Sequence, residues 1–393
     1  MIGKNGIPRN GRPVWADISL EAISANFRAI QKWVGGRKVL AVVKADAYGH
    51  GGPPVAKALE KAGADCFGVT CVSEGAELRA AGIRRPILVL TGWWDGESKY
   101  LFEYNLMPAV HRLEDLAALE SAAAAHAKKI RRPKFRHPFH LKIDTGMNRL
   151  GIRPGDVEEF ARRYHEMSHV KLVASFTHFA SSEDFSIHQT EEQEEVFAES
   201  VGRLRRAGVD PGELHMANSA AIVSRPSSWG HMVRPGALLY GYHQNYDPVE
   251  RRETAERGLQ LEPALTLRAR IIGLREVPAG EGIGYNATFH TTRPSRIAVI
   301  PAGYADGVVR RLSGKGHALV RGIEVPIVGV VSMDLTMVDV TEVTGTGVGD
   351  VVTVFGADGA RRISPFSVAR ELGTVTSDLL CSLGKRVPRQ YTK

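Results

Sequence analysis

The chain has 393 residues, a formal net charge of +8 and a sequence pI of about 9.4. Hydrophobic residues make up 43% and charged residues 24%, as in ordinary globular proteins, and the length suggests two domains. No run of about 18 apolar residues occurs, which argues against a membrane span and a membrane partner. The positive charge is spread along the chain apart from a cluster at 128–134, so it indicates an anionic small ligand rather than nucleic acid.

Residues 1–14 are polar and rich in glycine and proline, which predicts a flexible segment and not a signal peptide. The three cysteines, Cys66, Cys71 and Cys381, are an odd number and lack the spacing of a metal site. We therefore expect no disulfide framework and no bound metal, as is typical of a cytoplasmic protein.

Residues 15–19 predict a strand and residues 20–34 a helix. After them, short apolar runs rich in β-branched residues alternate with amphipathic stretches. The pattern predicts eight strands, at 39–44, 66–70, 87–90, 107–110, 139–144, 172–177, 213–216 and 237–240. Helices are predicted between them, for example at 53–62, 73–80, 113–127 and 191–206.

Eight strands alternating with helices indicate a (β/α)8 TIM-type barrel over residues 15–245, with a doubly wound parallel sheet as the alternative. The strand at 15–19 would be a ninth strand, one more than a barrel needs, so it is a candidate to pair with a second domain. The polar segment 244–258 predicts a connection. Short β-branched runs separated by glycine turns then predict a mostly β domain over residues 246–393; these runs lie at 265–277, 296–300, 318–331, 336–340 and 350–355.

The stretch VKADAYGHG, residues 43–51, places Lys44 at the C-terminal end of a predicted barrel strand. Barrel enzymes carry their chemistry at these ends. A desolvated lysine with a lowered pKa can bond covalently to a carbonyl group, whereas a lone lysine after a strand is usually a surface residue. Glycines that follow Lys44 allow a ligand to approach the backbone closely.

This nonapeptide resembles in full the pyridoxal-phosphate attachment motif of alanine racemases. The resemblance extends over most of the chain, through the blocks RPVWADISLEAISANFRAI, HLKIDTGMNRLGIRP, SFTHFASSE, HMANSAAI, MVRPGALLYG, GIGYNATF, PAGYADGVVRRL, PIVGVVSMDLTMVDVT and RVPR. It implies an enzyme with pyridoxal 5'-phosphate as cofactor and alanine as substrate. It also implies a homodimer with shared active sites that supplies D-alanine for cell-wall peptidoglycan.

Racemisation requires that a proton leave Cα on one face of the substrate and that another arrive on the opposite face, so two acid–base groups must flank the substrate. The resemblance assigns these roles to Lys44 and to Tyr285, which in the family enters the partner subunit's barrel. Since the ordinary pKa of tyrosine is near 10, Tyr285 needs positive charge or hydrogen-bond donors nearby to act as a base. Without the resemblance, Tyr285 would be interpreted as an aromatic residue of a strand or turn.

The loops after the last two strands of a barrel are a recurrent phosphate site. Asn218 and Ser219 follow the predicted seventh strand, and Gly236 and Ala237 adjoin the predicted eighth. Ser219 offers a hydroxyl and an N–H at a predicted helix start, although a plain N-cap would explain it equally well. By resemblance, Tyr48 is a further phosphate contact.

Arg234 resembles the family's partner of the cofactor's pyridine nitrogen. Because arginine only donates hydrogen bonds, that nitrogen must accept and stay unprotonated, which weakens the cofactor as an electron sink and disfavours transamination. His178 resembles the residue that links this arginine to the catalytic tyrosine, although a histidine on an apolar strand is usually a core residue. Arg149 resembles the contact to the substrate carboxylate and the cofactor hydroxyl, with Lys142, which is carbamylated in some members, as its neighbour.

Met333 and Asp334 resemble residues lent by the partner subunit, Met333 through its backbone near the substrate. The chain departs from the family at two positions. Asn148 stands where many members have glycine, and Lys385 stands where some members have a phosphate-binding tyrosine.

Three other functions are compatible with parts of this pattern. A broader-specificity amino-acid racemase of the same fold would need a roomier pocket, and such enzymes are often exported. A non-catalytic protein that binds pyridoxal phosphate in a barrel usually lacks the second domain. A related decarboxylase shares the architecture but matches the GYNATF and SMD blocks poorly.

Overall fold

The computed structural model describes residues 12–392, so most of the predicted flexible segment 1–14 lies outside the described residues. The chain separates into two compact units. The barrel unit consists of Ala22–Ala47 and Gly52–Glu262. The β unit consists of the described residues up to Glu21, of Tyr48–Gly51, and of the described residues from Pro263 onward.

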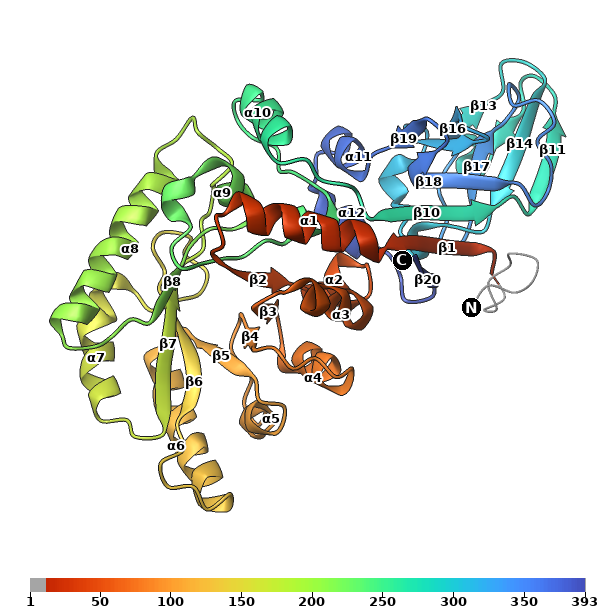
Figure 1. Cartoon of the computed structure of the whole chain (residues 1–393). Coiled ribbons are helices and arrows are strands. Elements are labelled where there is room, and N and C mark those ends of the chain that lie inside the picture. Colours follow the sequence, from red (N-terminus) through yellow and green to blue (C-terminus); the bar gives the residue numbers. More distant parts are fainter. Residues whose placement is uncertain (1–11, 393) are drawn as a thin grey trace. The chain divides into compact units, whose positions relative to one another are not determined.

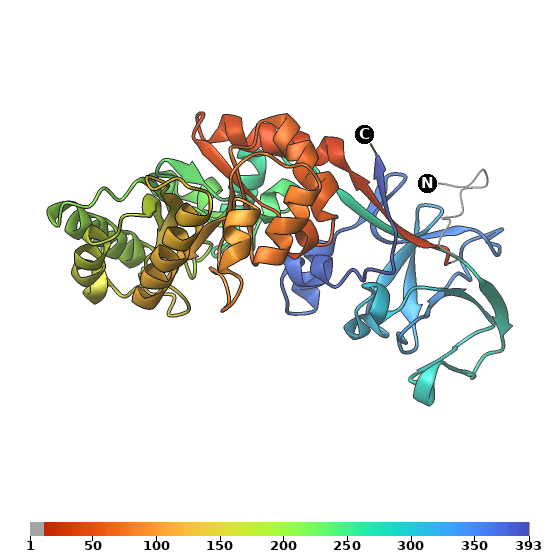
Figure 2. The ribbon, with the colours of Figure 1, turned by 90° about the horizontal axis from the view of Figure 1, so that it is seen from below.

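The barrel unit contains eight parallel strands in the order β8-β7-β6-β5-β4-β3-β2-β9, which form a nearly closed barrel. Figure 1 shows helices α3 to α8 on the outside of these strands, and Figure 2 shows the same unit from below. The strands are β2 (Lys38–Val42), β3 (Cys66–Val69), β4 (Ile87–Val89), β5 (Met107–Val110), β6 (His137–Lys142), β7 (Val170–Phe176), β8 (Glu213–His215) and β9 (Met232–Val233). Most strand positions are buried, because helices cover the outside of a parallel sheet.

The helices of this unit follow the amphipathic stretches of the sequence. They are α1 (Leu20–Trp33), α3 (Gly52–Ala62), α4 (Val72–Ala80), α5 (Ser98–Glu103), α6 (Leu113–Lys129), α7 (Val157–His165), α8 (Gln189–Arg206), α9 (Ser219–Ser224) and α10 (Glu250–Gly258). The 3-10 helices are η1 (Pro154–Asp156), η2 (Pro226–Ser228) and η3 (Ala237–Tyr240). The prediction of a (β/α)8 barrel followed by a mostly β region is confirmed.

The prediction of the eighth strand at 237–240 is wrong, because that strand is β9 (Met232–Val233) and residues Ala237–Tyr240 form η3. The run ALLY is apolar because it is buried, and a short apolar run does not distinguish a strand from a helical turn. Pro235 has no N–H to donate to a ladder, so the strand ends before it. Arg234 therefore follows the last strand instead of preceding one, and it lies at the C-terminal ends with the other predicted site residues.

The β unit contains a ten-stranded, mostly antiparallel sheet in the order β11-β14-β17-β16-β15-β18-β10-β1-β20, with β19 paired to β18. A separate hairpin consists of β12 (Gly282–Ile283) and β13 (Phe289–His290). The other strands are β1 (Val14–Ser19), β10 (Leu265–Arg270), β11 (Gly273–Val277), β14 (Ser295–Ile300), β15 (His317–Val320), β16 (Ile323–Val328), β17 (Thr336–Asp339), β18 (Val351–Asp358), β19 (Arg361–Ile363) and β20 (Arg389–Thr392). The remaining helical segments are α11 (Pro365–Glu371), α12 (Thr376–Cys381), η4 (Tyr285–Ala287), η5 (Tyr304–Asp306) and η6 (Arg310–Leu312).

Two of the predicted runs divide into pairs of strands. The run at 318–331 forms β15 and β16, joined at Arg321 and Gly322, whose φ angles are 52° and 73°. Two consecutive residues with positive φ are the signature of a tight hairpin turn. β1, the strand expected to be surplus to the barrel, pairs antiparallel with β10 and parallel with β20.

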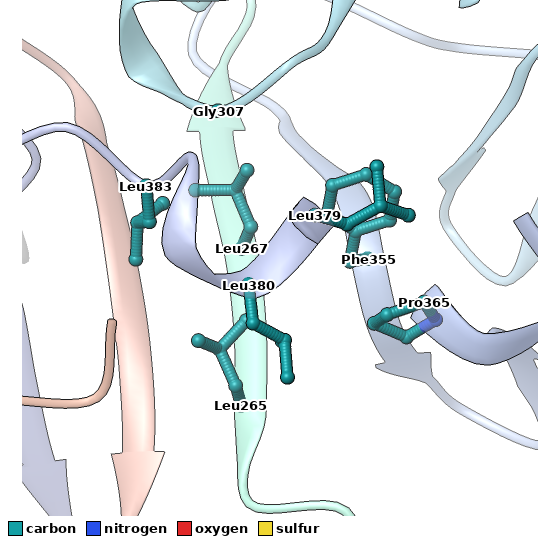
Figure 3. Close-up of a pocket in the computed structure, with 8 residues that line it drawn as sticks. All are labelled: Leu265, Leu267, Gly307, Phe355, Pro365, Leu379, Leu380 and Leu383. Atoms are coloured by element: carbon teal, nitrogen blue, oxygen red, sulfur yellow. The ribbon is translucent and has the colours of Figure 1, made fainter. Parts of the chain in front are cut away.

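Leucines of α12 and of the segment that follows it pack on β10 in the β unit. Figure 3 shows Leu379, Leu380 and Leu383 around Leu265 and Leu267. They enclose a cavity of about 10 Å³, which has room for one water molecule at most. Because its lining side chains are apolar, we interpret this cavity as a packing defect and not as a ligand site.

No helix within residues 12–392 has the length and apolar character needed to cross a membrane. None of the described cysteines, Cys66, Cys71 and Cys381, is part of a disulfide.

Candidate active site

Lys44 begins a left-handed turn, α2 (Lys44–Tyr48), directly after β2. The φ angles of Ala45, Asp46, Ala47 and Tyr48 lie between 52° and 54°. This conformation costs about 1–2 kcal/mol for each residue that has a Cβ. Such strain persists only where the surroundings impose it, and it is concentrated at functional sites.

Two carboxylates hold this turn in the barrel unit. Glu74 of α4 accepts hydrogen bonds from the backbone N–H of Ala45 and of Thr70, each at 2.7 Å. Asp46 accepts a hydrogen bond from the N–H of Gly52 at 2.6 Å. The sequence analysis missed Glu74, because Ala45 is 29 residues away and belongs to a turn that was not predicted.

Four cationic side chains gather near the C-terminal ends of the barrel strands. Burial, followed by the charges of Arg149 and Arg234, lowers the pKa of Lys142 to about 8; Asp144 opposes this shift, and Lys44 adds to it. Burial and these same cations lower the pKa of His178 well below its ordinary value, so His178 is neutral at pH 7. The electrostatics of the site therefore favour an anionic ligand.

The loop that carries Arg149 turns on the carboxylate of Asp144. One oxygen of Asp144 accepts hydrogen bonds from the N–H of Gly146 at 3.2 Å and of Asn148 at 3.0 Å. Asn148 has a φ of 55°, a region that asparagine adopts more readily than most residues. The replacement of the family's glycine by asparagine is thus compatible with the backbone. The Arg149 side chain is exposed.

Gln193 of α8 joins the loops that follow β6 and β7. Its amide nitrogen donates to the Thr145 hydroxyl at 3.2 Å and to the His178 carbonyl at 3.1 Å, and its oxygen accepts from the Ala180 N–H at 2.9 Å. Gln193 is 1% exposed. The sequence analysis missed it as well. The one available signal was a polar residue on the buried face of an amphipathic helix.

Arg234 is 4% exposed and uses both terminal nitrogens of its guanidinium. Nη1 donates to the carbonyl of His215 at 2.8 Å and to Nδ1 of the same residue at 3.0 Å. Nη2 donates to the carbonyls of Thr177 and Met216, each at 2.8 Å, and lies 3.2 Å from Nδ1 of His178. Within residues 12–392, Nε–H is the one donor of Arg234 without an identified partner.

Hydrogen-bond donors for an anion occur at the start of α9 and after β9. Asn218 is the N-cap of α9, and its side-chain oxygen accepts from the Ala221 N–H at 3.1 Å and the Ser182 hydroxyl at 2.8 Å. The N-cap is therefore Asn218 and not Ser219. The Ser219 hydroxyl oxygen accepts from the N–H of Gly236 at 2.9 Å, which leaves its own O–H to donate.

Tyr48 and Tyr285 belong to the β unit and differ in their surroundings. Burial, with a smaller effect of Cys381, raises the pKa of Tyr48 to about 12. Tyr285 is 68% exposed at the tip of the β12–β13 hairpin, where Asn286 and Ala287 have φ angles of 58° and 45°. The base of the hairpin packs in an apolar cluster formed by Ile283, Ile297 and Val328, with Val277, Phe289 and Met337 around it.

Met333 and Asp334 lie on a loop that two arginines hold. Arg386 donates to the Met333 carbonyl at 3.2 Å and to the Asp334 carboxylate at 2.7 Å. Arg386 and Arg12 both pair with Asp306, which is fully buried. The Met333 side chain is 52% exposed.

Lys385, beside Arg386, is exposed, so its side chain is not part of the core of the β unit.

The comparisons with known proteins agree along the chain. Residues 18–244 match the family model described as alanine racemase, N-terminal domain, and residues 264–391 match alanine racemase, C-terminal domain. The alanine racemase of Halothermothrix orenii is 40% identical over 383 residues, which cover 97% of both chains.

Solved structures are similar over the same span. The alanine racemase of Clostridium difficile 630 has a TM-score of 0.87 at 33% identity, over 97% of this chain and 96% of that one. The alanine racemase of Bartonella henselae, solved with covalently bound pyridoxal phosphate, has a TM-score of 0.83 at 28% identity, over 97% and 99%. From these matches and the eight-stranded barrel, we conclude that the chain belongs to the alanine racemase family and is an amino-acid racemase, an isomerase.

Proposed function

We propose that the protein interconverts L-alanine and D-alanine with pyridoxal 5'-phosphate as cofactor, and that Lys44 and Tyr285 are its two acid–base groups. The single observation that carries this proposal is the lysine at the end of β2, on a strained left-handed turn, among three further cations at the same end of the barrel. The Bartonella henselae relative, which was solved with pyridoxal phosphate covalently bound, supports the choice of cofactor.

The residues at the barrel end fit this cofactor chemically. Asp144 is the carboxylate whose charge acts on Lys142, and three other cations act on the same lysine, an excess of positive charge that suits a phosphate ester and a phenolic oxygen. The Ser219 O–H and the backbone N–H of Ala237 offer donors for the phosphate, while the Gly236 N–H orients the Ser219 hydroxyl by donating to its oxygen. Nε–H of Arg234 is left for a pyridine nitrogen. In this proposal Lys44 is the amine that binds the aldehyde carbon.

When bound, the cofactor withdraws electrons from Cα of the substrate and so acidifies the Cα–H bond. Lys44 then exchanges a proton with Cα on one face, and Tyr285 of a second subunit exchanges a proton on the other face. Arg149 holds the substrate carboxylate, which orients Cα between the two groups. Lys142, with its lowered pKa, is partly neutral near pH 8, and the neutral amine is the form that reacts with carbon dioxide to give a carbamate.

Arg234 keeps the pyridine nitrogen unprotonated, because a guanidinium can only donate to it. The geometry at Nδ1 of His178 supports a second role for this arginine. Since Nδ1 lies 3.2 Å from Nη2 of Arg234, it accepts a hydrogen bond and the His178 proton lies on Nε2. In the proposal, Nε2–H of His178 donates to the Tyr285 oxygen and so favours the tyrosine form that accepts a proton.

A homodimer would complete the site. Tyr285 and Met333 are 68% and 52% exposed in the chain that carries them, as expected for residues that serve a neighbouring copy. We place Tyr48 with the phosphate contacts, and Met333 and Asp334 with the residues lent by the partner subunit. The product D-alanine would serve peptidoglycan synthesis in the cytoplasm.

Assays with purified protein test the proposal. The protein should be yellow, and L-alanine and D-alanine should interconvert when circular dichroism or a D-amino-acid oxidase assay follows each direction. Serine and lysine, tested side by side with alanine at equal concentration, should react more slowly. A protein that stays colourless with added pyridoxal phosphate would refute the cofactor assignment, and a faster reaction with lysine would favour a broader-specificity racemase.

A further inference from the structure

Two buried histidines continue the hydrogen bonding of Arg234 into the barrel. Nη1 of Arg234 lies 3.0 Å from Nδ1 of His215, and Nε2 of His215 lies 3.0 Å from Nδ1 of His140. His215 is the last residue of β8 and is fully buried, and His140 on β6 is 2% exposed. Arg234, His215 and His140 thus form one hydrogen-bonded chain.

The donor and acceptor roles in this chain follow from chemistry. Arginine has no acceptor, so Nδ1 of His215 must accept and the His215 proton lies on Nε2. That Nε2–H donates to Nδ1 of His140, so the His140 proton lies on its own Nε2. Burial, followed by the charge of Arg234, lowers the pKa of His140 to about 3 and that of His215 well below its ordinary value. Both rings are therefore neutral at pH 7.

The surroundings hold the His215 ring in one orientation. Phe176 stacks on it, with ring centroids 4.7 Å apart and an angle of 6° between the planes. The guanidinium carbon of Arg234 lies 5.5 Å from the centroid of the same phenyl ring. Rotation of His215 would break this stack and both hydrogen bonds together.

His140 also lines a cavity of about 760 Å³ at the N-terminal ends of the barrel strands. Lys38, Asp65, Lys171 and Glu213 are among its other lining residues. Because charged side chains are part of the lining, a space of this size can supply a water acceptor for the remaining N–H of His140. The hydrogen-bonded chain of Arg234, His215 and His140 therefore runs between the two ends of the barrel.

We propose that His140 is a positioning residue for racemisation, because it holds Nδ1 of His215 as the acceptor that Arg234 requires. With Nη1 and Nη2 occupied, Nε–H of Arg234 is left to face the pyridine nitrogen of the cofactor. The consequence for catalysis rests on the proposed function. The hydrogen-bonded chain itself rests only on the residues described.

Replacement of His140 by an apolar residue should disturb Arg234 from a distance. In His140→Leu, Nε2–H of His215 would lack an acceptor in a buried place, which favours the tautomer with its proton on Nδ1. That proton would point at the Nη1–H of Arg234, so the guanidinium would lose an acceptor and its alignment. His140→Asn keeps an acceptor near the position of Nδ1 and should preserve the chain.

Nitrogen NMR of the cofactor-free protein, with ¹⁵N-labelled histidine, shows which ring nitrogen of His215 carries the proton and so tests the hydrogen-bonded chain directly. We expect His215 to carry its proton on Nε2 in the wild type and in His140→Asn, and on Nδ1 in His140→Leu. A wild-type His215 with its proton on Nδ1, or on both nitrogens, would overturn the inference. This result needs neither cofactor nor activity, and a wild-type His215 with its proton on Nδ1 overturns the inference even if His140→Leu does not fold.

The holoenzyme gives the second readout, the amount of pyridoxamine phosphate formed per racemisation turnover. Transamination moves the amino group of alanine to the cofactor and releases pyruvate, and a less firmly held Arg234 should permit more of it. We expect an increase of about tenfold in His140→Leu, the scale of one hydrogen bond to a charged group, and a wild-type ratio in His140→Asn.

His137→Leu is the matched control for this readout. His137 is also on β6 and 2% exposed, but its Nε2 lies 2.9 Å from the carbonyl of Leu106 and not near Arg234. It should lose stability and keep the wild-type ratio. If His140→Leu gives the same ratio as His137→Leu, His140 has only a structural role and the inference fails. If the wild type binds no cofactor, the proposed function fails instead, and the NMR result still stands.

Discussion

The barrel end and the Tyr285 hairpin present their chemical groups under opposite conditions. Arg234 is 4% exposed and Lys142 7%, and both are held by residues of their own unit. Tyr285 is 68% exposed, on a tip of three residues above a small apolar base. In the proposed function, the barrel end is a preformed half of the site, and the hairpin presents a side chain to a neighbouring copy.

This difference indicates where each half takes its reactivity from. Burial and neighbouring cations already shift the pKa values of Lys142 and His178 within one chain. The phenol of Tyr285 lies largely in solvent in its own unit. We therefore expect substitutions in the barrel to act within each chain and substitutions at the hairpin to act on a neighbouring copy.

Replacement of Lys44 should have the largest effect, because Lys44 has both a covalent and an acid–base role in the proposal. Lys44→Ala should lower the racemisation rate by about 10⁴-fold or more and abolish the covalent attachment of the cofactor. Visible absorbance and borohydride reduction followed by peptide mapping measure the attachment. Lys57→Ala, at an exposed lysine of α3, is the control and should match the wild type. A reduced cofactor label on any other lysine would contradict the assignment.

Replacement of Tyr285 tests the other half. Tyr285→Phe removes only the hydroxyl, so the hairpin should keep its packing. In D₂O, single-turnover loss of the Cα–H of L-alanine should slow by about 10²- to 10⁴-fold, and loss from D-alanine should slow less, because Lys44 remains.

Tyr100→Phe, at a partly exposed tyrosine of α5, controls for the loss of a phenol and should not change either rate. Equal slowing of both enantiomers in Tyr285→Phe would mean that one base serves both faces. The barrel end would then contain the whole acid–base machinery.

The burial of Lys142 among other cations should be visible in the pH dependence of the free energy of unfolding. Folding lowers the pKa of Lys142 from 10.5 to about 8, so between these pH values the unfolded chain binds more protons than the folded one. The free energy of unfolding that Lys142 contributes should therefore rise by about 3 kcal/mol as the pH rises from 8 to 10.5.

Urea unfolding of cofactor-free wild type and Lys142→Met, in buffer free of carbon dioxide, measures this contribution as the difference between the two proteins. Lys142→Met should be the more stable below pH 8, and the difference should vanish towards pH 10.5. A difference that does not change with pH would show that Lys142 is not desolvated. Added bicarbonate should stabilise only the wild type if Lys142 forms a carbamate.

Mixing two inactive variants should give the smallest change in activity. It tests directly whether Lys44 and Tyr285 of one site come from different subunits. Lys44→Ala and Tyr285→Phe are each nearly inactive in the proposal, yet a heterodimer regains one site with both wild-type residues. After equal mixing and exchange, half the dimers are heterodimers with one of two sites restored, so activity should return to about a quarter of the wild-type level. If exchange is verified by mass spectrometry and no activity returns, Tyr285 acts within its own chain.

The sequence predicted most barrel strands because each one is a short, largely buried run between amphipathic stretches. The strand predicted at 107–110 coincides with β5, and those predicted at 139–144 and 172–177 overlap β6 and β7. The run at 237–240 misled the prediction because η3 is as buried as a strand. Helices α11 and α12 were not predicted, because each is at most seven residues long and shows little more than one helical turn of periodicity.

The positions of the candidate site residues were predictable where these residues lie next to their own strand. Lys44 stands at the end of β2 as expected, and Arg234 and Ser219 lie near the strand ends. Glu74 and Gln193 were missed because each acts on loops up to 48 residues away, a proximity that only the folded barrel creates. The left-handed turn after Lys44 was also unforeseen, since alanine and aspartate ordinarily avoid positive φ.

The place of β1 between β10 and β20 has a consequence for how the chain is made. Its partner residues begin at Leu265, roughly 250 residues after Val14 leaves the ribosome. At about 5–20 residues per second, β1 waits for some ten to fifty seconds with both of its edges unpaired. An unpaired edge is a template for pairing with another chain. Among the strands of residues 12–392, β1 is thus the first to be synthesised, and the barrel can fold before the β unit has its full set of strands.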